Sequence, residues 1–128
     1  MKKLIILITF MIFYSYAYGE VYYCSENTNV GFRIKDNNNK MSFRPKRFKI
    51  KVDLQKPMIE SKEILMQSFN APICRYDSLF KTTIYCSSNI GLNIALDTTS
   101  NVFILARIFL IPNQNDTNNI SWGTCEIF

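Results

Sequence analysis

The 128-residue sequence contains no histidine, and it has only four glycines, four prolines and one tryptophan. Without imidazole the chain lacks the usual general base, proton shuttle and metal ligand, so histidine-dependent triads and zinc sites are excluded. The sequence also lacks a Cys-x-x-Cys pair, a Gly-x-Ser-x-Gly elbow and a phosphate-binding glycine loop. These absences predict a protein that is not an enzyme and that uses no metal and no cofactor.

Long hydrophobic runs are scarce, and the clearest one lies at the start of the chain. Lys2 and Lys3 precede an uncharged apolar run over residues 4–18, and Ala17 and Gly19 are small residues at the positions that signal peptidase inspects. We therefore predict a signal peptide over residues 1–19 and a single exported domain over residues 20–128. An uncleaved anchor is the weaker alternative, because about fifteen apolar residues are short for a bilayer-spanning helix. We expect a periplasmic or extracellular mature chain without a transmembrane segment.

Export determines how the four cysteines are interpreted. They all lie after the predicted cleavage site, and an even number of cysteines in a small exported domain predicts disulfide bonds. Three pairings are possible. Cys74 and Cys86 flank a short excursion, whereas Cys24 and Cys125 lie in the first and last predicted strands, which are neighbours if the sheet closes. We predict two disulfides, Cys74–Cys86 and Cys24–Cys125.

Strand patterns dominate the mature chain. Residues 47–54 alternate strictly, with Phe48, Ile50, Val52 and Leu54 on one face and charged side chains on the other. Runs rich in β-branched and aromatic residues, separated by turn signals, predict further strands at 21–24, 81–86, 92–96, 102–111 and 120–128. This spacing predicts an all-β fold, a small antiparallel meander that closes into a sandwich or barrel stapled by the two disulfides.

Two segments are less clear. Residues 58–69 fit a strand or an amphipathic helix, and we favour the strand. Residues 27–42 are rich in asparagine with little apolar periodicity, so most of this segment is expected to be an exposed loop.

The aromatic residues are assigned mainly to the interior. In a strand, Tyr22 and Tyr23 must point to opposite faces, so one of them is expected to be exposed. Trp122 is expected to cap one end of the barrel, with stacking on a ligand as the alternative. The aromatic side chains expected in the core are Phe48, Tyr85, Phe103 and Phe109.

Positive charge is concentrated in one stretch. Residues 33–51 hold eight basic side chains and a single acid, within a mature chain of 13 basic and 10 acidic residues. Alternate residues of a strand lie about 6.6 Å apart on one face, a spacing that suits successive phosphates or carboxylates. An anionic envelope component or an acidic protein is the expected partner, whereas nucleic acid is not expected because no recognition motif is present. A solvated face or a lysine-protected edge strand is the alternative. The candidate anion-binding residues are Arg44, Lys46, Arg47, Lys49 and Lys51.

Three stretches carry a resemblance over the whole chain. With residues 21–24 (Val-Tyr-Tyr-Cys), 43–51 (Phe-Arg-Pro-Lys-Arg-Phe-Lys-Ile-Lys) and 121–126 (Ser-Trp-Gly-Thr-Cys-Glu), the sequence resembles small exported proteins of AT-rich marine alphaproteobacteria. This resemblance implies an envelope location and a disulfide-stapled β domain, with no catalytic residue. A fainter resemblance is to envelope barrels that inhibit c-type lysozymes. Their Ser-Gly-x-x-Tyr type of loop is replaced here by Ser-Ser-Asn-Ile-Gly at 87–91.

The sequence thus predicts a non-catalytic exported binding or envelope-associated protein that contacts anionic surfaces through a basic strand face. Inhibition of a lysozyme or another hydrolase is the first alternative. An enzyme with an unfamiliar site is the second.

Overall fold

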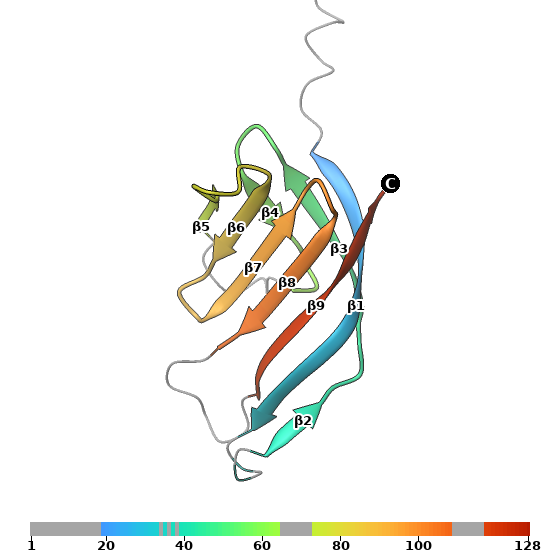
Figure 1. Cartoon of the computed structure of the whole chain (residues 1–128), viewed down its shortest axis with the longest axis vertical. Coiled ribbons are helices and arrows are strands. Elements are labelled where there is room, and N and C mark those ends of the chain that lie inside the picture. Colours follow the sequence, from blue (N-terminus) through green and yellow to red (C-terminus); the bar gives the residue numbers. More distant parts are fainter. Residues whose placement is uncertain (1–18, 34, 36, 38, 65–72, 109–116) are drawn as a thin grey trace, which may run out of the picture.

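The computed structural model describes residues 19–33, 35, 37, 39–64, 73–108 and 117–128, which form one antiparallel nine-stranded sheet (Figure 1). The all-β fold predicted from the sequence is confirmed. The strands are β1 (Glu20–Arg33), β2 (Lys40–Ser42), β3 (Arg47–Asp53), β4 (Met58–Glu60), β5 (Ile73–Tyr76), β6 (Thr83–Ser87), β7 (Leu92–Asp97), β8 (Val102–Arg107) and β9 (Thr117–Ile127).

The sheet is a meander that curls into a nearly closed barrel. Its strand order is β4-β3-β1-β9-β8-β7-β6-β5, and β2 pairs with the far end of β1. The first and last strands are therefore hydrogen-bonded neighbours, as the predicted closure requires. The seam lies instead between β4 and β5, which touch each other but are not paired in the described part of the sheet.

The core fills the barrel with alternate residues of neighbouring strands. Phe48, Ile50 and Val52 on β3 are buried as predicted, and Phe48 meets Phe103 edge to face at 5.1 Å between ring centroids. Full burial of such a side chain contributes about 1.5–3 kcal/mol. The other buried apolar side chains are Tyr22, Cys24, Ile59, Ile64, Ile84, Cys86, Leu92, Ile94, Leu96, Leu105 and Cys125.

The predicted disulfides are present. Cys24 and Cys125 face each other across β1 and β9, and Cys74 and Cys86 face each other across β5 and β6. They leave no free cysteine. The first bond links residues 101 positions apart, so it ties the two ends of the meander together.

The expected loop at residues 27–42 is wrong for most of its length. β1 continues to Arg33 beyond an irregularity between Glu26 and Thr28, and it pairs with β9 over the whole extension. The strand escaped prediction because its inward positions here include Asn29 and Gly31, which give no hydrophobic signal on the buried face. Backbone hydrogen bonds to β9 hold it in place.

Other predicted strand limits also differ. The strand proposed for 58–69 spans only Met58–Glu60, because the hydroxyl of Ser61 accepts the Glu63 and Ile64 N–H groups and forms a turn. β8 ends at Arg107, short of the predicted residue 111. Leu54 is exposed in the turn after β3, where Asp53 accepts two backbone N–H groups. Residues 65–69 lie outside the described residues.

The predictions for the aromatic residues are partly confirmed. Tyr22 is buried and Tyr23 is exposed, as strand alternation requires. Tyr85 and Trp122 lie on the outer face rather than in the core or over a barrel end, because they alternate with buried Cys86 and Ser121. Phe109 and the apolar run over residues 4–18 lie outside the described residues. Within the described ranges, no helix has the length and apolarity needed to cross a bilayer.

Candidate functional site

The predicted basic residues are all exposed and lie on β3 and in the segment just before it; they are here called the basic face (Arg44, Lys46, Arg47, Lys49 and Lys51). The last three alternate with the buried residues of β3 and therefore point outward. Arg44 and Lys46 lie in the connection that enters β3, and all five side chains are exposed. The geometry provides a row of three cations on the outer face of β3, with two further exposed cations just before it.

β3 lies between β1 and β4 in the sheet. It pairs with β1 over residues 47–52 but with β4 only over residues 51–53. Residues 47–50 therefore have a paired strand on one side only, and lysines that protect an open edge remain the alternative interpretation for this part of β3.

A buried carboxylate fixes the entry into the basic face. Glu26 is 6% exposed, and its Oε2 accepts the Lys46 N–H at 2.8 Å and the Asn29 side-chain amide at 3.1 Å. The Glu26 N–H donates to the Lys46 carbonyl at 2.9 Å. Charge-assisted hydrogen bonds of this kind are stronger than neutral ones, so they hold this connection against β1.

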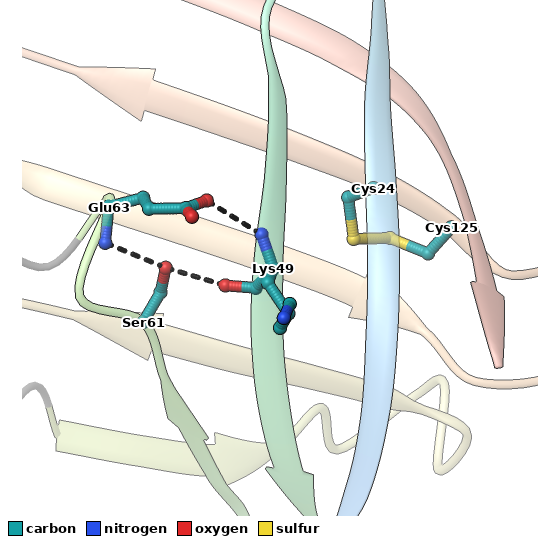
Figure 2. Close-up of a disulfide and its surroundings, with 5 residues drawn as sticks. All are labelled: Cys24, Lys49, Ser61, Glu63 and Cys125. Atoms are coloured by element: carbon teal, nitrogen blue, oxygen red, sulfur yellow. Dashed lines mark hydrogen bonds between the residues drawn. A yellow bond between two sulfur atoms is a disulfide. The ribbon is translucent and has the colours of Figure 1, made fainter. Parts of the chain in front are cut away.

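Lys49 is held at both its backbone and its side chain. Figure 2 shows Glu63 accepting the Lys49 N–H and the Ser61 hydroxyl donating to the Lys49 carbonyl, both at 2.8 Å. The Lys49 ammonium lies 4.9 Å from the centroid of the Tyr23 ring, within cation–π range. Lys51 lies opposite Glu60 on β4. The two glutamates thus border the basic face.

A polar cluster occupies the interior beside the entry to the basic face. Asn119 donates its side-chain N–H to the side-chain oxygen Oδ1 of Asn29 at 2.6 Å, and the Asn29 side-chain N–H in turn donates to Glu26. Ser121 is fully buried, and its hydroxyl has no hydrogen-bond partner in the described part of the chain. Asn29 and Asn119 are 90 residues apart, so only the pairing of β1 with β9 reveals this cluster.

The outer surface opposite this cluster is apolar and was not foreseen from the sequence. Here Ile104 lies directly across from Trp122, and Ile120 lies directly across from Val30. Figure 1 shows the three strands concerned, β8, β9 and β1, side by side. We call the exposed set the apolar stripe: Phe32, Ile104, Ile108, Ile120 and Trp122, each between 41% and 52% exposed.

Two further acidic residues, Asp77 and Asp97, have structural roles. Asp77 accepts the Phe80 and Leu79 N–H groups, and these bonds lower the pKa of its carboxyl. The pKa of Asp97 is lowered first by the Ser100 hydroxyl and then by the Thr99 N–H. Both carboxyl groups stabilise turns. Among the described residues, no group of three or more cysteine or acidic side chains is placed to hold a metal ion.

Residues 87–91 form the β6–β7 turn. The Ser88 N–H donates to the Leu92 carbonyl, the Ser88 hydroxyl accepts the Leu92 N–H, and Gly91 adopts a positive φ of 86°. These hydrogen bonds are internal to the turn.

Comparisons with protein-family models, with curated proteins and with solved structures found no match to this chain.

Proposed function

We propose that the protein is a non-catalytic exported binding protein that contacts an anionic component of the cell envelope through the basic face. The observation that carries this proposal is the grouping of five exposed basic side chains on and just before β3. Exposed cations that lie close together attract phosphates and carboxylates. The nearby acidic residues are Glu60 opposite Lys51, Glu63 at the Lys49 N–H and the buried Glu26 at the Lys46 N–H.

Export fits the same proposal. Two disulfides in a small domain are typical of an oxidising compartment, and they support a chain that passes through export with residues 1–19 as its signal peptide. In the periplasm or outside the cell, the abundant anions are lipid head groups and envelope polymers. Mass measurement of the mature protein tests the cleavage before Glu20, and an intact N-terminus would contradict it.

Binding to a phosphate-bearing polyanion resin tests the basic face. The parent protein is expected to bind the resin at about 50 mM salt and to be released by about 200 mM. Replacing Arg47, Lys49 and Lys51 with Glu is expected to abolish this binding. The matched control replaces the exposed Lys56, Arg75 and Lys81 with Glu, which changes the net charge equally but lies elsewhere. Equal retention of both variants would show that only net charge matters and would refute a role for this face.

A further inference from the structure

We propose that the outer surface over β1, β9 and β8 docks on a lipid bilayer that contains anionic lipids. This inference rests on the proposed function and names the partner class: the basic face supplies the charge, and the apolar stripe enters the membrane interface. Membrane-surface binding of this kind combines a buried apolar area with attraction between basic side chains and anionic head groups.

The first step of the argument is the continuity of the apolar stripe. Ile104 and Trp122 are cross-strand neighbours, Trp122 and Ile120 are two residues apart on the same face, and Ile120 faces Val30. Single exposed apolar side chains are ordinary on a protein surface, but a continuous set of large ones marks an interaction site. The stripe leaves about half of each of its side chains in water.

The second step is the charge beside the stripe. Lys40 on β2 lies directly opposite Phe32, so an ammonium group borders one end. Further along β1, Arg47 lies across from Ser25, and Ser25 lies across from Thr124 on β9. Two strand spacings amount to about 10 Å, which places Arg47 within one docking footprint with β9.

The charge also distinguishes a bilayer from a second copy of this chain. The mature chain carries 13 basic and 10 acidic residues, and the cations gather on the β2–β3 side of the stripe. Two copies joined stripe to stripe with their β2–β3 sides facing each other would bring like-charged flanks together, which is unfavourable. Anionic head groups are complementary to the same flanks.

A groove of about 400 Å³ extends the stripe at the end that Lys40 borders. Apolar side chains of Val30, Phe32, Ile108 and Ile120 line it, together with Lys40. A hollow of this size is within the range of ordinary ligand sites. An apolar wall next to an ammonium group suits a lipid acyl chain with its phosphate at the rim.

Trp122 provides a direct test because it is the only tryptophan in the chain. The experiment titrates the protein with vesicles of phosphatidylcholine alone or mixed with phosphatidylglycerol, while Trp122 emission and sedimentation are followed. Binding to the mixed vesicles with a blue shift of the emission is expected, and no binding to phosphatidylcholine alone.

The stripe variant combines Ile104→Ser with Ile120→Ser and keeps the reporter. It is expected to bind mixed vesicles at least about tenfold more weakly, because apolar burial is lost, yet to bind the polyanion resin like the parent. The matched control, Leu79→Ser with Phe80→Ser, removes two exposed apolar side chains from the β5–β6 connection and is expected to bind both. Near-ultraviolet circular dichroism checks that each variant is folded.

The outcomes separate the two proposals. Unchanged vesicle binding by the stripe variant, or an equal loss in the control, overturns the docking site while the basic face stands. Failure of the parent on the resin and on both kinds of vesicle overturns both proposals. A parent dimer that dissociates in the stripe variant, with no vesicle binding by either, assigns the stripe to a second copy and also overturns docking.

Discussion

Two sections of the same barrel have opposite polarity. The core section consists of β3, β5–β8, residues 20–25 of β1 and residues 124–127 of β9. Its inward side chains are apolar, and it contains both disulfides. In the polar section, residues 26–33 of β1 and 117–123 of β9 turn amide, hydroxyl and carboxylate groups inward, and their members of the apolar stripe, Phe32, Ile120 and Trp122, face outward. The backbone pairing of β1 with β9 continues through both sections, so it forms whether the inward side chains are apolar or polar.

The two sections are held together by different interactions. Apolar burial and covalent links stabilise the core section, whereas specific hydrogen bonds hold the polar section in register. Gly123 lies at the boundary, where an added Cβ would come within 1.9 Å of the Ser25 carbonyl oxygen. This close approach of β9 to β1, next to the irregularity in β1, requires a residue without a side chain.

The largest expected effect is the loss of the long-range disulfide. Replacing Cys24 and Cys125 with Ala is expected to lower the free energy of unfolding by about 4–5 kcal/mol, because the bond closes a loop of 101 residues. Replacing Cys74 and Cys86, which close a loop of 12, is expected to cost about 3 kcal/mol. Urea unfolding of the two variants measures the difference in their free energies of unfolding. A larger loss of stability for the Cys74 and Cys86 variant would contradict the expectation that the longer loop gives the more stabilising disulfide.

Neighbouring residues on β8 sharpen the contrast between inside and outside. Phe103 is fully buried against Phe48, so Phe103→Ala is expected to cost about 3–5 kcal/mol. Ile104 is 52% exposed on the apolar stripe, and Ile104→Ala is expected to change stability by no more than about 0.5 kcal/mol. Similar losses in thermal or urea unfolding would mean that the stripe is covered in the folded protein.

The core section also contains a buried hydroxyl whose titration is measurable. Burial, and then the hydrogen bond to Glu20, raise the pKa of Tyr22 from 10.0 to about 12. Below pH 10 the hydroxyl is protonated in both the folded and the unfolded chain, so its full contribution to stability is present. Between pH 10 and about 12 the unfolded chain loses the proton first, and stability falls as pH rises.

The free energy of unfolding is expected to fall by about 2–3 kcal/mol over this pH range, because each pKa unit corresponds to about 1.36 kcal/mol. Urea unfolding at successive pH values measures it, with Tyr22→Phe as the control that lacks the titrating group. An equally steep decline in the phenylalanine variant would assign the pH dependence to other residues.

The smallest effect concerns the polar section. Glu26→Gln replaces a buried carboxylate that accepts the Lys46 N–H and the Asn29 amide, and it is expected to cost about 1–3 kcal/mol. Amide hydrogen exchange at Lys46 is expected to become faster. Glu60→Gln, at an exposed position on β4, is the control and is expected to leave both quantities unchanged. No change in Lys46 exchange would mean that Glu26 does not hold the connection.

Sequence reasoning succeeded where apolar alternation and strand order coincide. The alternation of β3 was visible because Phe48, Ile50 and Val52 face a packed interior. It failed at Asn29, Asn119 and Ser121, because their inward position gives no hydrophobic signal and their partners are distant in the chain. Tyr85 and Trp122 were assigned to the wrong place because aromatic content alone does not tell which face of a strand a residue occupies.

The scarcities of the sequence by themselves exclude histidine chemistry, and its alternation, turns and cysteines by themselves determine an all-β, disulfide-linked meander with a cationic strand. These features are local or follow from chain order. Only the tertiary structure decided that β3 lies between β1 and β4, that β1 extends to Arg33 and that the apolar stripe lies beside the basic face. The physical reason is that strand register is set between distant segments, and a shift of one residue exchanges the inner and outer faces.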